Sequence, residues 1–359
     1  MSVKNLILAI NPGSTSTKIA VYDGEEQLFI KNIKHAAEDI AKFDKIADQY
    51  EFRKDIILKE ISQEGFNLQE FKVIVGRGGL LKPISGGIWE VNEAMKNDLR
   101  IGVSGQHASN LGGLIASDIA ATIPNAKAII ADPVVVDELE DIARVSGHPL
   151  MPRRSVFHAL NQKAIARKHS KAVGKPYEDL NLIIVHLGGG ISVGAHKGGM
   201  VIDVNQALDG EGPFSPERTG SLPVNEVIRV CFSGEYTEAQ IRKMVCGAGG
   251  FVAYLGTNDA YQVECKAAEG DKQAEFIQDA MAYQVSKEIG AIATVLKGKV
   301  DGILLTGGIA YSKPFVAAVS ERVEFIAPIT VYAGEDEMGS LAMNAMLLIN
   351  KEVESKIYV

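Results

Sequence analysis

Short apolar runs, separated by small and polar residues, recur along the chain and predict a series of buried strands. The first run, residues 6–10, is wholly apolar, which is typical of a strand that is buried on both faces. A turn of small and hydroxyl residues follows at 11–17. Residues 18–21 then resume as a second strand, which the turn pair Asp23-Gly24 closes. The pattern predicts a β-hairpin at the start of the chain.

Apolar residues at helical spacing predict several helices in the rest of the sequence. Residues 35–62 predict one or two surface helices, and further helices are expected at 91–97, 110–122, 161–171, 274–296 and 335–350. Other apolar runs predict strands at 71–75, 128–131, 182–185 and 303–305, and Asp203 is expected on one more strand. The final helix has an apolar face, so we expect it to cover a sheet.

The pattern of the opening hairpin returns in residues 182–195. The segment LIIVHLGGGISVGA matches ILAINPGSTSTKIA in kind, with an apolar strand, a polar residue, a tight small-residue turn and a second strand. A constant offset pairs equivalent positions of the two copies: Asn11 with His186, Gly13 with Gly188, and Ala20 with Ala195. Two such hairpins predict a duplicated domain with two loops that face each other across a cleft.

Turns of this kind can bind a phosphate, because their backbone N–H groups can point inward and no bulky side chain blocks the approach. The first turn taken alone favours an ordinary Asn-Pro-Gly turn that carries polar side chains. A third strand-to-glycine turn follows at residues 306–310. The chain has no G-x-x-x-x-G-K-[ST] motif, and no G-x-G-x-x-G that opens a helix, so a dinucleotide-binding fold is disfavoured.

The composition narrows the class of protein. A chain of 359 residues with 46% hydrophobic and 23% charged residues is typical of a globular protein of two domains. A net charge of -8 disfavours non-specific binding to nucleic acid or anionic membranes. The 3 cysteines show no C-x-x-C spacing, which argues against disulfides or a zinc site and favours the cytoplasm. No signal peptide or membrane-spanning run is expected.

The order of the three glycine turns resembles the acetate and sugar kinase/Hsp70/actin superfamily. Within it, the chain resembles the acetokinase family of short-chain fatty-acid kinases. The motifs that carry the resemblance lie in the family's order: 11–14 (NPGS), 107–111 (HASNL), 153–158 (RRSVFH), 186–190 (HLGGG), 218–220 (RTG) and 306–309 (TGGI). Arg77-Gly78-Gly79 stands where acetate kinases have His-Gly-Gly, and Gly189 stands where they have asparagine. These departures, and the shorter chain, resemble the branch that acts on butyrate.

The resemblance implies an α/β protein of two duplicated domains with the actin-like ATPase (ribonuclease H-like) fold. Each domain would be a mixed sheet flanked by helices, with a cleft between them. Residues 1–133 plus 338–359 would form the domain for the acyl group and the terminal phosphate, and residues 134–337 the nucleotide-binding domain. The implied reaction is reversible, direct, in-line transfer from ATP to butyrate, giving ADP and butyryl phosphate.

Other activities stay open at this point. Within the class, the acid could be acetate, propionate or a branched-chain acid. A nucleotide-switched binding protein of the actin or chaperone type would bind ATP without turning over an acid. A phosphatase-like member would hydrolyse polyphosphate or nucleotides without an acyl acceptor.

The implied reaction needs cationic side chains that stabilise negative charge more than it needs a general base. A carboxylate is already ionised at neutral pH, so the difficulty lies in bringing two anions together and stabilising the transferring phosphoryl group. Arginine suits this task because it is always charged and binds two oxygens at once. Arg218 lies in a long irregular stretch, residues 208–223, and is the first candidate. Arg77, which lies between glycines, is the second.

The resemblance places further groups around the phosphoryl group. His158 would donate a hydrogen bond to it, and His107 and His186 would be further donors, although each is also compatible with a core histidine. Asp132 would lie near the metal and the phosphoryl group. An Asp that ends a strand before a proline is also an ordinary turn former.

The three loops are expected to bind ATP or ADP. The contacting residues would be Asn11, Gly13, Ser14 and Ser16 of the first loop, His186, Gly188, Gly189 and Gly190 of the second, and Gly307, Gly308 and Ile309 of the third. Lys18 lies on the returning strand and is expected only to flank the site.

The remaining expectations concern the metal, the acid and the assembly. Mg²⁺ is expected because it bridges phosphate oxygens. Asn11 and Glu337 would lie near it. Glu335 is the alternative to Glu337, because residues 335–337 can be aligned with the family in more than one register. Either glutamate could instead stabilise the N-terminus of a helix electrostatically. Phe157 and Pro216 are expected in the pocket for the acyl chain. The family resemblance also implies a homo-oligomer.

Overall fold

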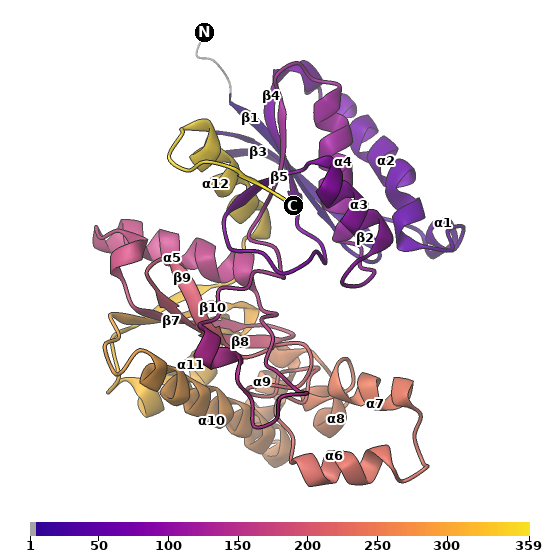
Figure 1. Cartoon of the computed structure of the whole chain (residues 1–359). Helices are drawn as coiled ribbons and strands as arrows, with labels where there is room; N and C mark the ends of the chain where they lie inside the picture. The colour runs from indigo at the N-terminus through magenta and orange to yellow at the C-terminus, as the bar shows by residue number, and fades with distance from the viewer. Residues whose placement is uncertain (1–4) are drawn as a thin grey trace. The chain divides into compact units, whose positions relative to one another are not determined.

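The computed structural model describes residues 5–359 and divides into two compact units (Figure 1). Unit 1 comprises the described residues up to Val136 together with Asp336–Val359. Unit 2 comprises Asp137–Glu335. Within the described chain, no helix is both long and apolar enough to span a bilayer.

Unit 1 is built on a seven-stranded sheet in the order β12-β5-β6-β4-β1-β2-β3. The strands are β1 (Leu6–Pro12), β2 (Ser16–Asp23), β3 (Glu26–Lys34), β4 (Phe71–Arg77), β5 (Ile88–Glu90), β6 (Lys127–Ala131) and β12 (Lys356–Ile357). Strand β1 pairs antiparallel with β2 and parallel with β4, which in turn is parallel to β6. Every residue of β1 is buried, so this strand forms the centre of the core, as its apolar run predicts.

Helices cover both faces of this sheet (Figure 1). They are α1 (Ala37–Ile40), α2 (Tyr50–Gln63), α3 (Glu93–Ile101), α4 (Asn110–Ala121) and α12 (Glu337–Ile349), with short 3₁₀ turns at Ile46–Gln49 and Leu68–Glu70. Helix α4 packs on β4 and β6, and α12 packs on β1 and β4. The last helix therefore returns to the first sheet, and its apolar face covers it as predicted.

Unit 2 is built on a five-stranded sheet in the order β11-β10-β7-β8-β9. The strands are β7 (Leu182–Leu187), β8 (Ile191–Lys197), β9 (Met200–Val204), β10 (Gly302–Gly307) and β11 (Ile329–Ala333). The helices are α5 (Ala159–Val173), α6 (Val224–Cys231), α7 (Glu238–Val245), α8 (Gly250–Leu255), α9 (Ala260–Ala268), α10 (Lys272–Val295) and α11 (Lys313–Val323), with 3₁₀ turns at Asp141–Arg144, Tyr177–Asp179 and Gly308–Tyr311. Helices α5 and α10 pack on this sheet.

The two sheets share one plan, which confirms the duplicated fold. In each, an antiparallel meander of three strands is followed by two parallel strands: β3-β2-β1-β4-β6 in unit 1 and β9-β8-β7-β10-β11 in unit 2. The constant sequence offset holds only through the first strand of each hairpin. Ala9 pairs with Ala20, whereas the matching Ile184 pairs with Gly194, because the second turn is shorter by one residue. The predicted match of Ala20 with Ala195 is therefore wrong by one position.

Several elements lie outside the predicted set. Strand β3 shows no alternation of apolar and polar residues, because it is an edge strand with Ile33 as its single buried residue. The predicted glycine turn after 71–75 begins later than expected, since Gly76 and Arg77 are still part of β4. The sequence also does not predict strands β5, β11 and β12 or helices α6 to α9 and α11.

Candidate active site

The first hairpin turn borders a cavity of about 310 Å³ in unit 1, which we call the unit 1 pocket. The turn is closed by the amide of Gly13, which donates to the carbonyl of Ser16 at 2.8 Å. The pocket is lined by Asn11, Pro12, Gly13, Ser16, Lys18, Asn32, Arg77, His107, Ser109 and Glu337. It thus brings together six of the predicted site residues from four separate parts of the chain. Lys18, which the sequence expectation leaves as a flanking residue, also lines it.

The carboxylate of Glu337 connects Arg77 with Asn11 in this pocket. One of its oxygens forms an ion pair with the Arg77 guanidinium, and the other accepts a hydrogen bond from Asn11 Nδ2 at 2.5 Å. Arg77 reaches this position because β4 and α4 approach each other closely. A Cβ atom on Gly76 would collide with the backbone of Gly112. The glycines before and after Arg77 therefore serve packing as well as the site.

His107 presents a neutral imidazole to the same pocket. The Ser109 amide donates to His107 Nδ1 at 3.2 Å, so this nitrogen carries a lone pair and the ring proton sits on Nε2. Desolvation lowers the pKa of His107, and the positive charge of Arg77 lowers it further. The ring is therefore held as a neutral N–H donor, which suits it to bind an anion.

Two predicted residues of unit 1 lie apart from the lining of this pocket. Asp132 is buried, its Oδ1 accepts from the Gly87 amide at 2.6 Å, and its backbone has a positive φ of 37°. These contacts fit the turn-forming alternative. Ser14 is exposed at the tip of the hairpin turn.

A buried arginine beneath the first turn was missed by the sequence reasoning. Arg53 of α2 is 1% exposed and donates to the carbonyls of Gly13, Ser14 and Ser16 at 2.7 to 3.1 Å. The signal was present in the sequence: Arg53 takes a place on the stripe of α2 that also carries Ile57 and Ile61, which are fully buried. A charge on such a stripe requires an internal partner.

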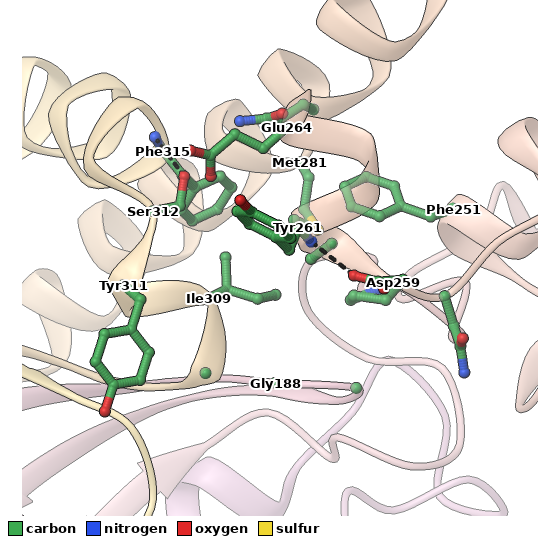
Figure 2. Close-up of a pocket in the computed structure, with 16 residues that line it drawn as sticks. Gly188, Phe251, Asp259, Tyr261, Glu264, Met281, Ile309, Tyr311, Ser312 and Phe315 are labelled. Carbon is green, nitrogen blue, oxygen red and sulfur yellow. Dashed lines mark hydrogen bonds between the residues drawn. The ribbon is translucent and has the colours of Figure 1, made fainter. Parts of the chain in front are cut away.

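Unit 2 contains a second cavity, of about 540 Å³, which we call the unit 2 pocket (Figure 2). Its lining includes Gly188 and Gly189 of the second hairpin turn and Gly308 and Ile309 of the third turn. The other lining residues come from the segment before α8, from helices α8 to α11 and from the connections between them: Pro216, Phe251, Asn258, Asp259, Ala260, Tyr261, Glu264, Gln278, Met281, Tyr311, Ser312 and Phe315. Two glycine turns and an apolar wall suit a nucleotide, whose phosphates need amides and whose base needs an apolar surface.

The third turn depends on a glycine with a special conformation. Gly307 has a φ of 89°, and a Cβ atom there would collide with the backbone of Leu187. Its amide and carbonyl exchange hydrogen bonds with Gly334 at 3.0 and 2.9 Å. Gly307 therefore allows the third turn to lie directly beside the end of β7, next to the second turn.

His158 and His186 stack on one another behind the second turn. Their ring centroids are 3.8 Å apart and their planes differ by 11°. Nδ1 of His158 lies 2.9 Å from Ser192 Oγ, and Nδ1 of His186 lies 2.9 Å from Asn161 Oδ1. Glu335 Oε2 is 4.0 Å from His186 Nε2, so Glu335 lies beside the histidines of unit 2, whereas Glu337 lies beside Asn11.

Arg218 packs directly against the second hairpin turn. Its Nη1 donates to the Ala207 carbonyl at 2.7 Å, and its guanidinium occupies the place that a Cβ atom on Gly190 would take. Within residues 5–359, the buried Nε of Arg218 has no hydrogen-bond partner. The geometry brings the predicted arginine to the predicted loop with part of its donor capacity unused.

The two residues expected in the acyl pocket lie in different surroundings. Pro216 lines the unit 2 pocket together with the glycine turns. Phe157, beside His158, is 2% exposed and lines neither of the two pockets described above.

Residues 142–332 match the model of the acetokinase family. The chain is 55% identical over 356 residues to butyrate kinase 2 of Clostridium acetobutylicum, which covers 99% of this chain and 100% of the relative. It is 54% identical over 352 residues to a probable butyrate kinase of Bacteroides thetaiotaomicron, covering 98% and 99% of the two chains. Among solved structures, it resembles acetate kinase of Porphyromonas gingivalis with a TM-score of 0.75 at 16% identity, covering 96% and 100%. The last likeness shows a shared fold.

Proposed function

The chain belongs to the acetokinase family, and we infer that it catalyses the reversible phosphorylation of butyrate by ATP, which gives ADP and butyryl phosphate. The observation that carries this inference is the 55% identity, over essentially the full length of both chains, to a relative named butyrate kinase. A pocket bordered by two glycine turns in unit 2, and a pocket at the first hairpin turn that Lys18 and Arg77 line in unit 1, support it.

We propose that the unit 2 pocket binds the nucleotide. The adenosine would lie against Ile309 and the apolar wall, beside Gly307 and Gly308. The inner phosphates would lie at the second turn, where Gly188 to Gly190 leave the backbone accessible. Pro216 lines this pocket, so we assign it to the nucleotide rather than to the acyl chain.

We propose that the unit 1 pocket binds the terminal phosphate and the carboxylate. Lys18, Arg77 and the neutral His107 supply positive charge and an N–H donor to two anions that repel each other. Phe157 and Asp132 remain proposed members of the acyl and phosphoryl sites.

In the proposed transfer, a carboxylate oxygen of butyrate attacks the γ-phosphorus in line. A new O–P bond forms while the bond from the γ-phosphorus to the oxygen of ADP breaks, and ADP leaves with that electron pair. No proton needs to be removed from the acceptor. Arg218 and an N–H of His158 would stabilise the negative charge on the transferring group, which is the main catalytic requirement in phosphoryl transfer.

We propose Mg²⁺ as the metal that accompanies ATP. Among the described residues, no group of three or more His, Cys, Asp or Glu side chains is arranged to hold a metal. Mg²⁺ does not need such a group, because it is commonly bound by one or two carboxylates, phosphate oxygens and water. Asn11 and Glu337 contact each other in the unit 1 pocket, and a carboxylate oxygen of Glu337 and the amide oxygen of Asn11 would hold the ion there. The ion would neutralise phosphate charge.

We further propose that the enzyme is a cytoplasmic homo-oligomer. The cytoplasm supplies its substrate ATP and suits three free cysteines. Helix α6 has no buried residue, and Val224, Ile228 and Phe232 expose apolar side chains at a spacing of four residues. A second copy of the chain would cover this stripe. Light scattering tests this: a dimer or larger assembly that Ile228→Asp dissociates supports the proposal, whereas a monomeric parent protein contradicts it.

Trapping the acyl phosphate tests the proposed activity. The protein is incubated with ATP, Mg²⁺, butyrate and hydroxylamine, which converts butyryl phosphate into a coloured hydroxamate. Formation that depends on both ATP and butyrate is expected. ATP hydrolysis that butyrate does not affect, without any hydroxamate, would instead indicate a hydrolase or a nucleotide-switched binding protein.

A further inference from the structure

Arg53 is a buried cation whose hydrogen bonds converge on the first hairpin turn. Its Nη1 donates to the carbonyls of Gly13 at 2.7 Å and Ser16 at 3.1 Å, and its Nη2 donates to the carbonyl of Ser14 at 3.1 Å. Gln49 Oε1 accepts from Nε and Nη2 at 3.1 and 2.7 Å and so fixes the plane of the guanidinium. A single side chain thus holds three of the carbonyls of the turn.

These contacts determine where the amides of the turn point. In a trans peptide, the C=O of one residue and the N–H of the next point in opposite directions. The carbonyls of Gly13 and Ser14 face Arg53, so the N–H groups of Ser14 and Thr15 face away from it. The carbonyl of Thr15 accepts from the His35 amide at 2.9 Å, which directs the N–H of Ser16 away from His35. Because the carbonyls of the turn face the protein interior, its amide N–H groups point toward the outside of the turn, where they can bind a phosphate.

The charge of Arg53 has no acidic counterpart among the residues the structure describes. Its hydrogen bonds go to carbonyls, to Gln49 and to Thr17 Oγ1, and desolvation lowers its pKa. The neighbouring His35 ring, whose Nε2 lies 2.8 Å from Thr17 Oγ1, also has its pKa lowered, by burial and by Arg53. A buried charge without a counter-ion is costly, and an anion bound on the turn would reduce this cost.

We propose that Arg53 is a positioning residue: it orients the first turn, and its positive charge balances the negative charge of a phosphate bound on that turn. The turn therefore distinguishes a nucleotide with a terminal phosphate from one without. The proposal rests on the inferred kinase function only in naming ATP as that nucleotide. Arg53 itself touches the turn rather than the substrate. It therefore acts on ATP binding and not on ADP binding.

The ratio of two dissociation constants tests this role. Binding of AMPPNP and of ADP, each with Mg²⁺, is measured by calorimetry on the full-length protein and on Arg53→Met. We expect the variant to bind AMPPNP at least about tenfold more weakly and to bind ADP within about twofold of the parent protein. The rate constant kcat should fall about 100-fold, as for loss of an oriented donor. Arg53→Lys keeps the charge but not the three-carbonyl geometry, so it should recover part of the AMPPNP affinity.

Ile57→Val is the matched control, because Ile57 is fully buried one turn further along the same helix and makes no hydrogen bond to the turn. It should lower Tm without changing the ratio. A folded Arg53→Met protein with the parent's AMPPNP-to-ADP ratio would overturn the proposal. If Arg53→Met does not fold, Gln49→Met decides in its place, since it removes the acceptor that orients the guanidinium; an unchanged ratio would again overturn it. A parent protein that binds AMPPNP but forms no butyryl hydroxamate would refute the kinase function and leave this test intact.

Discussion

The imidazole rings of His158 and His186 lie parallel at a centroid distance of 3.8 Å, although the residues belong to different elements. His158 precedes the first residue of α5, and His186 lies near the end of β7. Ser192 and Asn161 contact their Nδ1 atoms and fix both rings. Each histidine therefore holds the other in place beside the second hairpin turn, where the proposed mechanism requires a donor to the transferring phosphoryl group.

Replacing His158 should slow the chemical step more than it weakens binding. His158→Phe keeps a flat ring but loses the N–H donor, and we expect kcat to fall about 10² to 10³-fold. The dissociation constant of ADP should stay within about threefold. Steady-state hydroxamate formation and ADP calorimetry measure the two quantities. His169→Phe is the control, since His169 lies on the same helix and contacts Tyr332; equal losses in both variants would contradict the role of His158.

Glu337 and Glu335 should differ in their effect on the requirement for Mg²⁺. Glu337 contacts Asn11 and Arg77, whereas Glu335 lies near His186. We expect Glu337→Gln to raise the Mg²⁺ concentration needed for half-maximal activity at least about tenfold, because a charged ligand is lost. Glu335→Gln should leave it within about twofold. Activity titrations with Mg²⁺ at saturating ATP measure this requirement in both variants. A larger increase for Glu335→Gln than for Glu337→Gln would refute the proposal that Glu337 lies at the metal.

Substitutions of Gly190 and of Arg218 should both lower kcat. Arg218→Ala is expected to lower kcat by several orders of magnitude while the fold stays intact. Gly190→Ala should cause a large part of the same loss, because its Cβ would displace the Arg218 guanidinium. Gly290→Ala in α10 is the matched control, since nothing lies within 4 Å of a Cβ there. Normal kcat in either the Arg218 or the Gly190 variant would be incompatible with the proposed role.

The stability of the protein should decrease as the pH falls below about 6.5. His196 is fully buried between Tyr177 OH and Gln162 Oε1, and burial, together with Lys163 and Arg167, holds its pKa well below 6.5. The unfolded chain takes up a proton there before the folded chain does. His196 alone should therefore contribute up to about 1.4 kcal/mol for each pH unit below that point to the drop in the free energy of unfolding, to which His35 and His107, whose pKa values are also lowered, add.

Urea unfolding between pH 7.5 and 5.5 measures this slope. His196→Gln, which keeps hydrogen-bonding capacity without titrating, should reduce the slope by the contribution of His196. His148→Gln is the control, because His148 is exposed. A parental slope in the His196 variant would show that the pH dependence has another source.

The sequence predicted the elements whose signal is local. Strand β1 is a continuous apolar run and α10 is a long periodic helix, and both are present within two residues of their predicted bounds. The sequence did not predict edge strand β3, because only Ile33 in it is buried. It did not predict β12 either, because a strand of two residues is too short to show a pattern. The one-residue difference between the two hairpin turns was also invisible, since strand register depends on pairing across the sheet.

The candidate site shows the same limit. The glycine turns, Arg218 and the histidines are marked by motifs in the sequence. Arg53 belongs to no motif, because its role arises only when α2 packs beneath a turn that lies 40 residues earlier in the chain. The ion pair of Arg77 with Glu337 joins residues 260 positions apart. Such relationships come from the tertiary fold and not from local sequence.

The acid-specificity profile tests the central claim most directly. The ratio kcat/KM is measured for acetate, propionate, butyrate, valerate and isobutyrate in the acyl-phosphate-forming direction, with ATP and Mg²⁺ saturating and hydroxylamine as the trap. We predict that butyrate exceeds acetate at least about tenfold, because an apolar pocket discriminates by this much for each methylene. A marked preference for acetate, or no hydroxamate with any of these acids, would contradict the account.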